Sequence, residues 1–139
     1  MRKNNRQTIN PADIFDPTPY GFAHSIRATN PSSICFVSGQ SGGVGLNHEL
    51  SPDFRTQVQA ALQNLRLQLE MQSMDLSDVV KITLLIVDHN LDKLSIWSEE
   101  ATNVWDATAL PTSTLIPVQQ LALPGMLFEI DAVAQKGSE

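Results

Sequence analysis

The run of nine mostly apolar residues at 79–87 constrains the fold more than any other segment of this chain. Valine, isoleucine and leucine occupy both alternating sets of positions in it, with Lys81 and Thr83 as the exceptions. Strands buried on both faces have this composition, whereas strands exposed on one face alternate between apolar and polar residues. The segment therefore predicts a central strand, and the remaining elements have to surround it.

Two amphipathic helices are predicted, one before and one after this strand. The first begins where Ser51 can cap it and a proline fits its first turn. Its apolar positions recur every three or four residues, namely Phe54, Val58, Ala61, Leu62, Leu65 and Leu69. The opposite, glutamine-rich face, which includes Gln57, is expected to be solvated. The second helix covers about residues 91–106 and buries Trp97 and Trp105 by the same spacing.

Four further strands are predicted from apolar runs bounded by turn residues. Residues 22–28 and 34–38 are expected to pair as a hairpin. Residues 112–118 contain a proline, which removes a backbone donor and predicts an edge strand or a bulge near Pro117. Residues 126–134 form the last strand, and their alternating pattern gives that strand two different faces.

The predicted order is strand, strand, helix, strand, helix, strand, strand, which is an α+β arrangement. Residues 1–20 are polar and contain three prolines, so they are expected to form an irregular leader before a single domain over 21–139. Two helices can cover only one face of a mixed sheet of five or six strands. An uncovered face with apolar residues commonly marks an interface. Helices are therefore predicted on one face and partner subunits on the other.

Composition and charge exclude several classes of function. The chain carries 9 basic and 15 acidic residues, a net charge of −6, and three of the basic residues lie in the first six positions. Nucleic-acid binding requires clustered lysine and arginine, so this balance argues against it. The single cysteine, Cys35, permits no internal disulfide and fits a reducing compartment. No apolar run is long enough for a membrane span and no secretory signal is present, so a cytoplasmic location without membrane contact is expected.

Motifs associated with catalysis are sparse. The glycine-rich stretch 39–45 fits neither a dinucleotide fingerprint nor a phosphate-binding loop and predicts a flexible connection. The three histidines lie in separate elements, which predicts no metal site, and no Gly-x-Ser-x-Gly elbow marks a serine nucleophile. Glu129 is the unusual residue, because a carboxylate in an apolar strand needs solvent, a partner or a pocket. It either faces solvent on an edge strand or orients and deprotonates water in a semi-enclosed site.

Five segments in the right order resemble the RidA (YjgF) family of reactive-intermediate deaminases. They are residues 34–40 (ICFVSGQ), 57–65 (QVQAALQNL), 78–83 (DVVKIT), 110–113 (LPTS) and 128–134 (FEIDAVA). The resemblance covers about residues 20–135 and implies a chorismate-mutase-like ββαβαββ fold. It also implies a homotrimer packed through the sheet face that lacks helices, with a ligand cleft between neighbouring subunits. Active members of the family hydrolyse enamine or imine metabolites without a cofactor, and ammonia leaves.

The resemblance also implies site residues. Glu129 matches the glutamate that positions water, and Ser38 and Gly39 match the site residues of the second strand. An aromatic hydroxyl lies near the start of the first strand in the family. Here Tyr20 fits that position, or Phe22 does, in which case the hydroxyl is absent.

The main departure from the family pattern is a missing arginine. Ser113 stands where the family has the arginine that binds a substrate carboxylate, and Leu115 stands at a small polar or cysteine position. Serine cannot make the bidentate contact that arginine makes with a carboxylate. One interpretation is a cleft that binds a small metabolite other than a simple 2-imino acid, or hydrolyses it through Glu129. A second is a 2-iminobutanoate or 2-iminopropanoate deaminase with Arg27 as a substitute cation, and a third is a nucleic-acid-binding or ribonuclease-like role.

Overall fold

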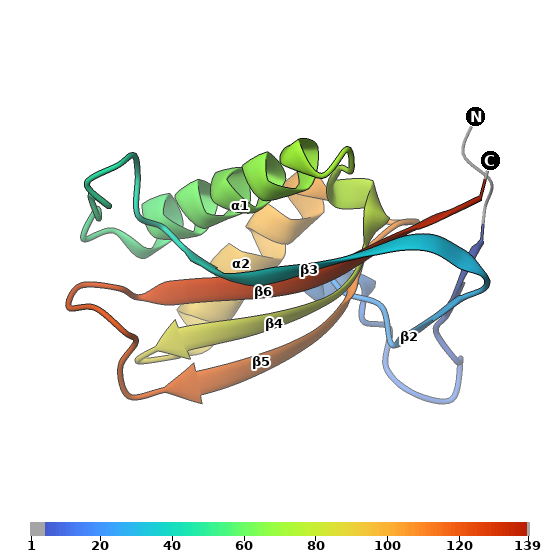
Figure 1. The fold of residues 1–139 in the computed structure, drawn as a ribbon. Helices are drawn as coiled ribbons and strands as arrows, with labels where there is room; N and C mark the ends of the chain where they lie inside the picture. The colour runs from blue at the N-terminus through green and yellow to red at the C-terminus, as the bar shows by residue number, and fades with distance from the viewer. Residues whose placement is uncertain (1–4, 139) are drawn as a thin grey trace.

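The computed structural model describes residues 5–138, which form six strands, two α-helices and two short 3-10 helices. In chain order these are β1 (Arg6–Ile9), η1 (Thr18–Tyr20), β2 (Ser25–Ala28), β3 (Pro31–Ser41), α1 (Phe54–Met71), η2 (Leu76–Asp78), β4 (Val79–Val87), α2 (Leu91–Val104), β5 (Thr112–Val118) and β6 (Phe128–Gly137). Both α-helices lie on one face of the large sheet (Figure 1), which confirms the α+β class and the placement of the helices. Over residues 5–138, none of the helices has the length and hydropathy needed to cross a membrane.

The large sheet contains four strands in the order β3-β6-β4-β5. β6 runs antiparallel to both β3 and β4, whereas β4 and β5 are parallel, with the crossover made through α2. The sequence correctly predicted that 79–87 is an inner strand and that the strand containing proline is an edge strand. It was wrong to expect five or six strands in one sheet, because β1 and β2 form a separate two-stranded sheet.

The predicted hairpin between residues 22–28 and 34–38 is also wrong. β2 pairs antiparallel with β1 instead, over four residue pairs. β3 pairs in the sheet with β6, so its other edge carries no strand from the described part of the chain. The leader expected at 1–20 is consequently not irregular throughout, because it supplies β1 and η1. A single domain over 21–139 remains a prediction.

Arg6 fastens β1 to the body of the domain. Its guanidinium donates to the backbone carbonyl oxygens of Ser77 (2.7 Å), Val79 (3.2 Å) and Leu110 (3.4 Å). Burial lowers the pKa of this guanidinium, and the negative charge of Asp78 opposes that shift. One leader side chain therefore binds both the start of β4 and the segment that precedes β5.

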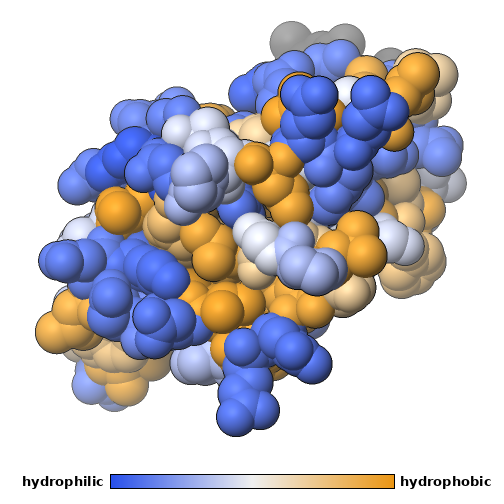
Figure 2. All heavy atoms as spheres, turned by 90° about the vertical axis from the view of Figure 1, so that its left-hand side faces the viewer, coloured by the Kyte–Doolittle hydropathy of each residue, from blue (hydrophilic) through white to orange (hydrophobic). Residues whose placement is uncertain are grey.

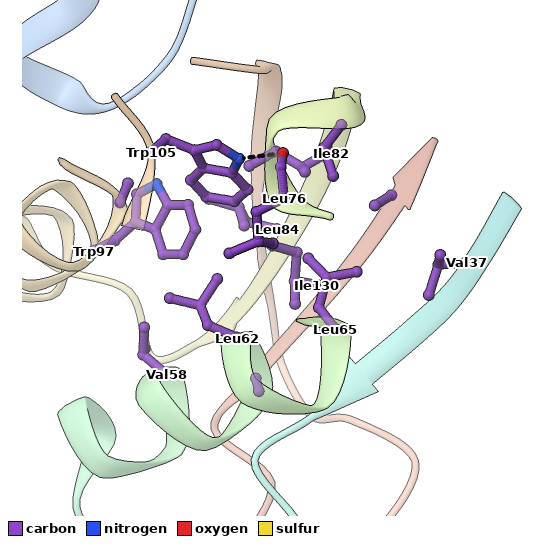
Figure 3. Close-up of a cluster of buried hydrophobic side chains, with 14 of the residues drawn as sticks. Val37, Val58, Leu62, Leu65, Leu76, Ile82, Leu84, Trp97, Trp105 and Ile130 are labelled. Atoms are coloured by element: carbon purple, nitrogen blue, oxygen red, sulfur yellow. Dashed lines mark hydrogen bonds between the residues drawn. The ribbon is translucent and has the colours of Figure 1, made fainter. Parts of the chain in front are cut away.

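The hydrophobic core lies between the helices and the sheet (Figure 3). All six apolar positions predicted for the first helix are buried. Trp97 stacks on Phe128 with ring centroids 5.5 Å apart, and the indole N–H of Trp105 donates to the carbonyl oxygen of Leu76 at 2.8 Å. Cys35 is half-buried and packs against this core. The predicted packing roles of the two tryptophans are therefore confirmed.

The start of α1 differs from the prediction in two ways. Asp53 rather than Ser51 is the N-cap, and its carboxylate accepts from the backbone N–H three residues on at 3.0 Å. Gln57, expected in solvent, is completely buried. Its side-chain nitrogen donates to the carbonyl oxygens of Ser51 (2.6 Å) and Gly125 (2.8 Å), and its oxygen accepts from the N–H of Leu127 (2.9 Å). This glutamine therefore connects the helix to the segment that leads into β6.

The sheet face opposite the helices has no helix of residues 5–138 against it, and we call it the bare face. The bare face includes Phe36, Lys81, Thr83, Leu85, Ile116, Glu129, Asp131 and Val133. On β4, the helix-facing side chains are almost completely buried, whereas Lys81 is exposed and Leu85 is half-buried. β4 is thus buried on one face only, contrary to the prediction. Phe36 is 77% exposed and Ile116 is 43% exposed, which leaves apolar area for another surface to cover.

Candidate functional site

Glu129, the residue expected to position water, projects from β6 onto the bare face. β6 is an inner strand, so the alternative of a carboxylate on an edge strand is wrong. The side chain is half-buried and lies opposite Ser41 on β3 and Leu85 on β4. Its carboxylate makes no hydrogen bond or ion pair with the rest of the described chain. A half-buried carboxylate without a protein partner is available to hold water or a ligand.

Gly39 makes room for the Glu129 carboxylate. The register of β3 against β6 shifts between Val37 and Gln40, so Ser38 and Gly39 form a β-bulge. A β-carbon on Gly39 would lie 1.8 Å from Oε1 of Glu129, and a larger residue would displace the carboxylate. Ser38 is exposed, and its carbonyl oxygen accepts from the Gln40 side chain at 3.1 Å. The structure therefore brings the predicted glutamate and glycine into contact, with Ser38 beside them.

Ser113 and Leu115 face the helices rather than the bare face. They pair with Ile82 and Leu84 on β4, whose side chains belong to the core, and directly paired residues share a face of a sheet. Both are half-buried, and Leu115 packs against the core. Within one chain, these two predicted site residues therefore lie on the face of the sheet opposite to Glu129.

Tyr20 and Phe22, the two candidates for the aromatic position, lie on the same apolar hollow. Phe15 stands between them, with its ring centroid 6.2 Å from each of theirs. The backbone N–H of Ala23 donates to the carbonyl oxygen of Pro111 at 2.9 Å, which holds this segment beside the start of β5. The hollow has a volume of about 680 Å³ and is lined by Phe15, Asp16, Pro19, Tyr20, Phe22 and Leu94. The sequence analysis did not include Phe15 among the site residues. The only indication in the sequence is that Phe15 is an aromatic residue within a polar leader.

The charged residue that lines this hollow is an aspartate, Asp16. Asp16 accepts from the backbone N–H of Thr18 at 3.0 Å and from its hydroxyl at 2.8 Å, and these bonds lower the pKa of Asp16. Arg55 on α1 is engaged elsewhere, since it donates to Glu100 (2.6 Å) and Glu99 (2.8 Å), which raise its pKa. Nowhere in residues 5–138 do three histidine, cysteine or acidic side chains gather in a way that could hold a metal ion.

Arg27, the proposed substitute for the missing arginine, does not approach Glu129 in one chain. It lies on β2, and its Nη2 donates to Oε1 of Gln7 on β1 at 2.5 Å. Figure 1 shows β2 at the end of the large sheet where β3 begins and β6 ends, whereas Glu129 is at the start of β6. The two side chains therefore lie at opposite ends of the domain.

The fold and the amino-acid sequence together identify the family. The sequence profile of the family described as Endoribonuclease L-PSP matches residues 18–136, which is most of the chain. The chain belongs to the endoribonuclease L-PSP family. This family includes the RidA (YjgF) proteins, and the resemblance found in the sequence is confirmed.

Three solved structures are similar to this chain. The Yersinia pestis protein YyfB, of the conserved Rid family and of unknown function, is 29% identical, with a TM-score of 0.87 over 94% of this chain and 98% of that one. The protein YJGH is 25% identical, with a TM-score of 0.67 over 97% and 99%. TdcF from E. coli with bound serine is 21% identical, with a TM-score of 0.67 over 89% and 98%, and supports the fold alone. No curated protein matches this chain at a significant level.

In this L-PSP family member, the predicted site residues fall into two groups. The first group lies on the bare face around the start of β6 and comprises Ser38, Gly39 and Glu129. The second group lies around β5 and the hollow beside η1 and comprises Tyr20, Phe22, Ser113 and Leu115. One chain alone does not join the two groups into a single site.

Proposed function

We propose that this chain is a small-metabolite hydrolase or binding protein of the Rid type, with a cleft formed between the subunits of a homotrimer. The observation that carries the proposal is the Glu129 carboxylate, which lies against Gly39 and has no hydrogen-bond or ion-pair partner within residues 5–138. Ser113 lies on the other face of the same sheet, so one cleft can contain both groups only if neighbouring chains supply one each. The exposed Phe36 and Ile116 on the bare face provide apolar area for that contact.

The proposed reaction is the hydrolysis of a C=N bond. Glu129 accepts a proton from water as the water oxygen adds to the imine carbon, and it then passes that proton to the imine nitrogen. The carbinolamine then collapses to a carbonyl compound, and the nitrogen leaves as ammonia. The position of Glu129 suits this role, because its carboxylate is half-buried and lies against Gly39, where it can orient a water molecule.

The proposed substrate has no carboxylate beside the imine. Ser113 cannot provide the charge-assisted bidentate contact that an anionic substrate requires. The wall of the hollow is mainly apolar, and its charged residue is the acidic Asp16. An apolar imine or enamine therefore suits this surface better than a simple 2-imino acid does.

The test compares two imines that are generated in the assay. An amino-acid oxidase acting on alanine supplies 2-iminopropanoate, and an amine oxidase acting on benzylamine supplies an imine without a carboxylate. We expect the protein to accelerate ammonia release from the second imine only. Glu129→Gln should lower that rate by about 100-fold or more, which is the usual contribution of general base catalysis.

Asp131→Asn provides the matched control, because Asp131 lies on the same strand and face as Glu129. Its carboxylate already accepts from the backbone N–H of Thr83 at 3.1 Å. This variant should retain the activity. Rapid turnover of 2-iminopropanoate by the wild type would overturn the substrate assignment, and full activity of Glu129→Gln would overturn the role of Glu129.

A further inference from the structure

A serine and a histidine meet where β3 ends, outside the residues that the family resemblance implies. The hydroxyl oxygen of Ser41 is 2.5 Å from Nε2 of His48. The same oxygen accepts from the backbone N–H of Gly43 at 3.2 Å. Because Gly43 donates to the oxygen, the hydroxyl proton of Ser41 can point to Nε2, which a neutral imidazole offers as an acceptor. This is the arrangement of a nucleophile with its base.

The surrounding chain holds this pair in place. A β-carbon on Gly43 would lie 1.9 Å from Cδ2 of His48, so only glycine leaves space for the imidazole. His48 itself has a φ of 51°, in the left-handed region that non-glycine residues rarely adopt and that often marks functional sites. Asn64 on α1 donates to the carbonyl oxygens of Ser41 (2.9 Å) and Gly43 (2.8 Å). The glycine-rich stretch, predicted to be flexible, is therefore held to α1 at Ser41 and Gly43.

The pair is accessible and lies beside an acidic group. Ser41 and His48 are both half-buried, and Ser41 is directly opposite Glu129 in the β3–β6 ladder. Figure 2 views the end of the domain that is on the left in Figure 1, where this loop lies, and shows apolar patches interspersed with polar ones. Within the loop, Val44 is 56% exposed and Leu46 is completely exposed. The exposed apolar side chains of this loop favour a small apolar molecule beside the pair, while the carboxylate of Glu129 disfavours an anion.

We propose that Ser41, activated by His48, is a nucleophile that accepts acyl groups from small, uncharged esters. As Oγ attacks the ester carbonyl carbon, its proton passes to Nε2 of His48. The tetrahedral adduct then collapses, and the alcohol leaves with that proton. Water releases the acyl group from Ser41 in the same way, with His48 taking the proton from water and returning it to Oγ. Both the nucleophile and its base come from one chain, and Ser113 takes no part in the step.

The experiment uses p-nitrophenyl acetate as the probe and reads the result by mass spectrometry. We expect one acetyl group per chain, mapped to Ser41 after digestion, together with the release of p-nitrophenol. Ser41→Ala should abolish the adduct, and His48→Gln should slow its formation by about 100-fold, because general base assistance is lost. Added imidazole should restore part of the rate of His48→Gln, which a merely structural contact would not show.

Ser51→Ala is the matched control. The hydroxyl of Ser51 also accepts from a backbone N–H two residues on, that of Asp53 at 3.1 Å, but no histidine contacts it. This variant should be acetylated at Ser41 at the wild-type rate. Acetylation of Ser41 no faster than that of Ser51, or no effect of His48→Gln, would overturn the proposal. The imine proposal fails separately, since its readout is ammonia release and the affected residue is Glu129.

Discussion

The helix-facing side of the large sheet buries the Phe128 ring against Trp97, whereas the bare face leaves the Phe36 ring 77% exposed. On the first face, one chain supplies both surfaces that are in contact. On the second, apolar side chains share the surface with Lys81 and with Glu129, whose carboxylate bonds to nothing in the described part of the chain. The stability of the fold therefore depends mainly on the helix-facing side of the sheet, whereas the completion of the site depends on the bare face. Substitutions on the two faces should therefore have separable effects.

The largest expected effect comes from the helix-facing side. Trp97 is 2% exposed and contacts the rings of Phe128 and Trp105. Trp97→Ala removes those contacts and leaves a cavity, so the free energy of unfolding should fall by about 3–5 kcal/mol. Urea denaturation followed by circular dichroism measures the change. A loss below about 1 kcal/mol would show that the helix-facing side does not stabilise the fold more than the bare face does.

On the bare face, Phe36→Asp should affect assembly rather than folding. The exposed ring contributes little to the stability of one chain, but a carboxylate in an apolar contact between subunits would be costly to desolvate. Sedimentation analysis should show a homotrimer for the wild type and a smaller species for the variant. A wild-type chain that remains monomeric at high concentration would contradict the proposed cleft between subunits.

Gly39→Ala tests the contact between the β-bulge and the Glu129 carboxylate. The added methyl group meets the flexible end of the glutamate side chain, which can swing away with little strain on the backbone. Unfolding free energy should change by less than about 1 kcal/mol, while imine hydrolysis should fall about as far as in Glu129→Gln. Comparison with the double variant Gly39→Ala, Glu129→Gln gives the coupling, because the second substitution should then add little.

The smallest effect concerns pH and the N-cap of α1. Hydrogen bonds from the Thr56 side chain, and then from its backbone, lower the pKa of Asp53 in the folded protein. A group whose pKa is lowered on folding stabilises the protein above its unfolded value, near pH 4, and that contribution is lost as pH falls through the folded value. Asp53→Asn keeps an acceptor that does not titrate. Its Tm should decline less than that of the wild type between pH 5 and 3, by about 1–2 °C.

Sequence periodicity predicted the elements that local chemistry determines. The three- and four-residue spacing of apolar side chains located α1 and its buried face, and the double-sided apolar run located the inner strand β4. The chain order of helices and strands was sufficient to place both helices on one face. The run of motifs that ends in residues 128–134 identified the family, and it includes Glu129.

Features that depend on distant backbone groups were not predictable. Gln57 occupies a polar position on a helix, and nothing in the sequence shows that carbonyl groups of two loops face it. The segment that pairs with β2 is four residues long and largely polar, so the sequence favoured a hairpin with the more apolar β3. Ser41 and His48 match no motif, because a left-handed turn and a glycine bring them together. The sequence could not show whether Tyr20 or Phe22 occupies the aromatic position of the family. In the structure both side chains line the same hollow.

The hydrogen bonds of Arg6 also determine whether the protein tolerates the removal of its N-terminal residues. The family match begins at residue 18, so a chain shortened to that boundary would lose β1 and the guanidinium beneath three backbone carbonyl groups. Those oxygens would then depend on water, and β2 would have no partner strand. A protease that removes the first residues would therefore loosen the start of β4 and the entry to β5, far from the cleavage point in sequence. The chain has to be handled with its leader intact, because the family profile begins at residue 18, inside the folded unit.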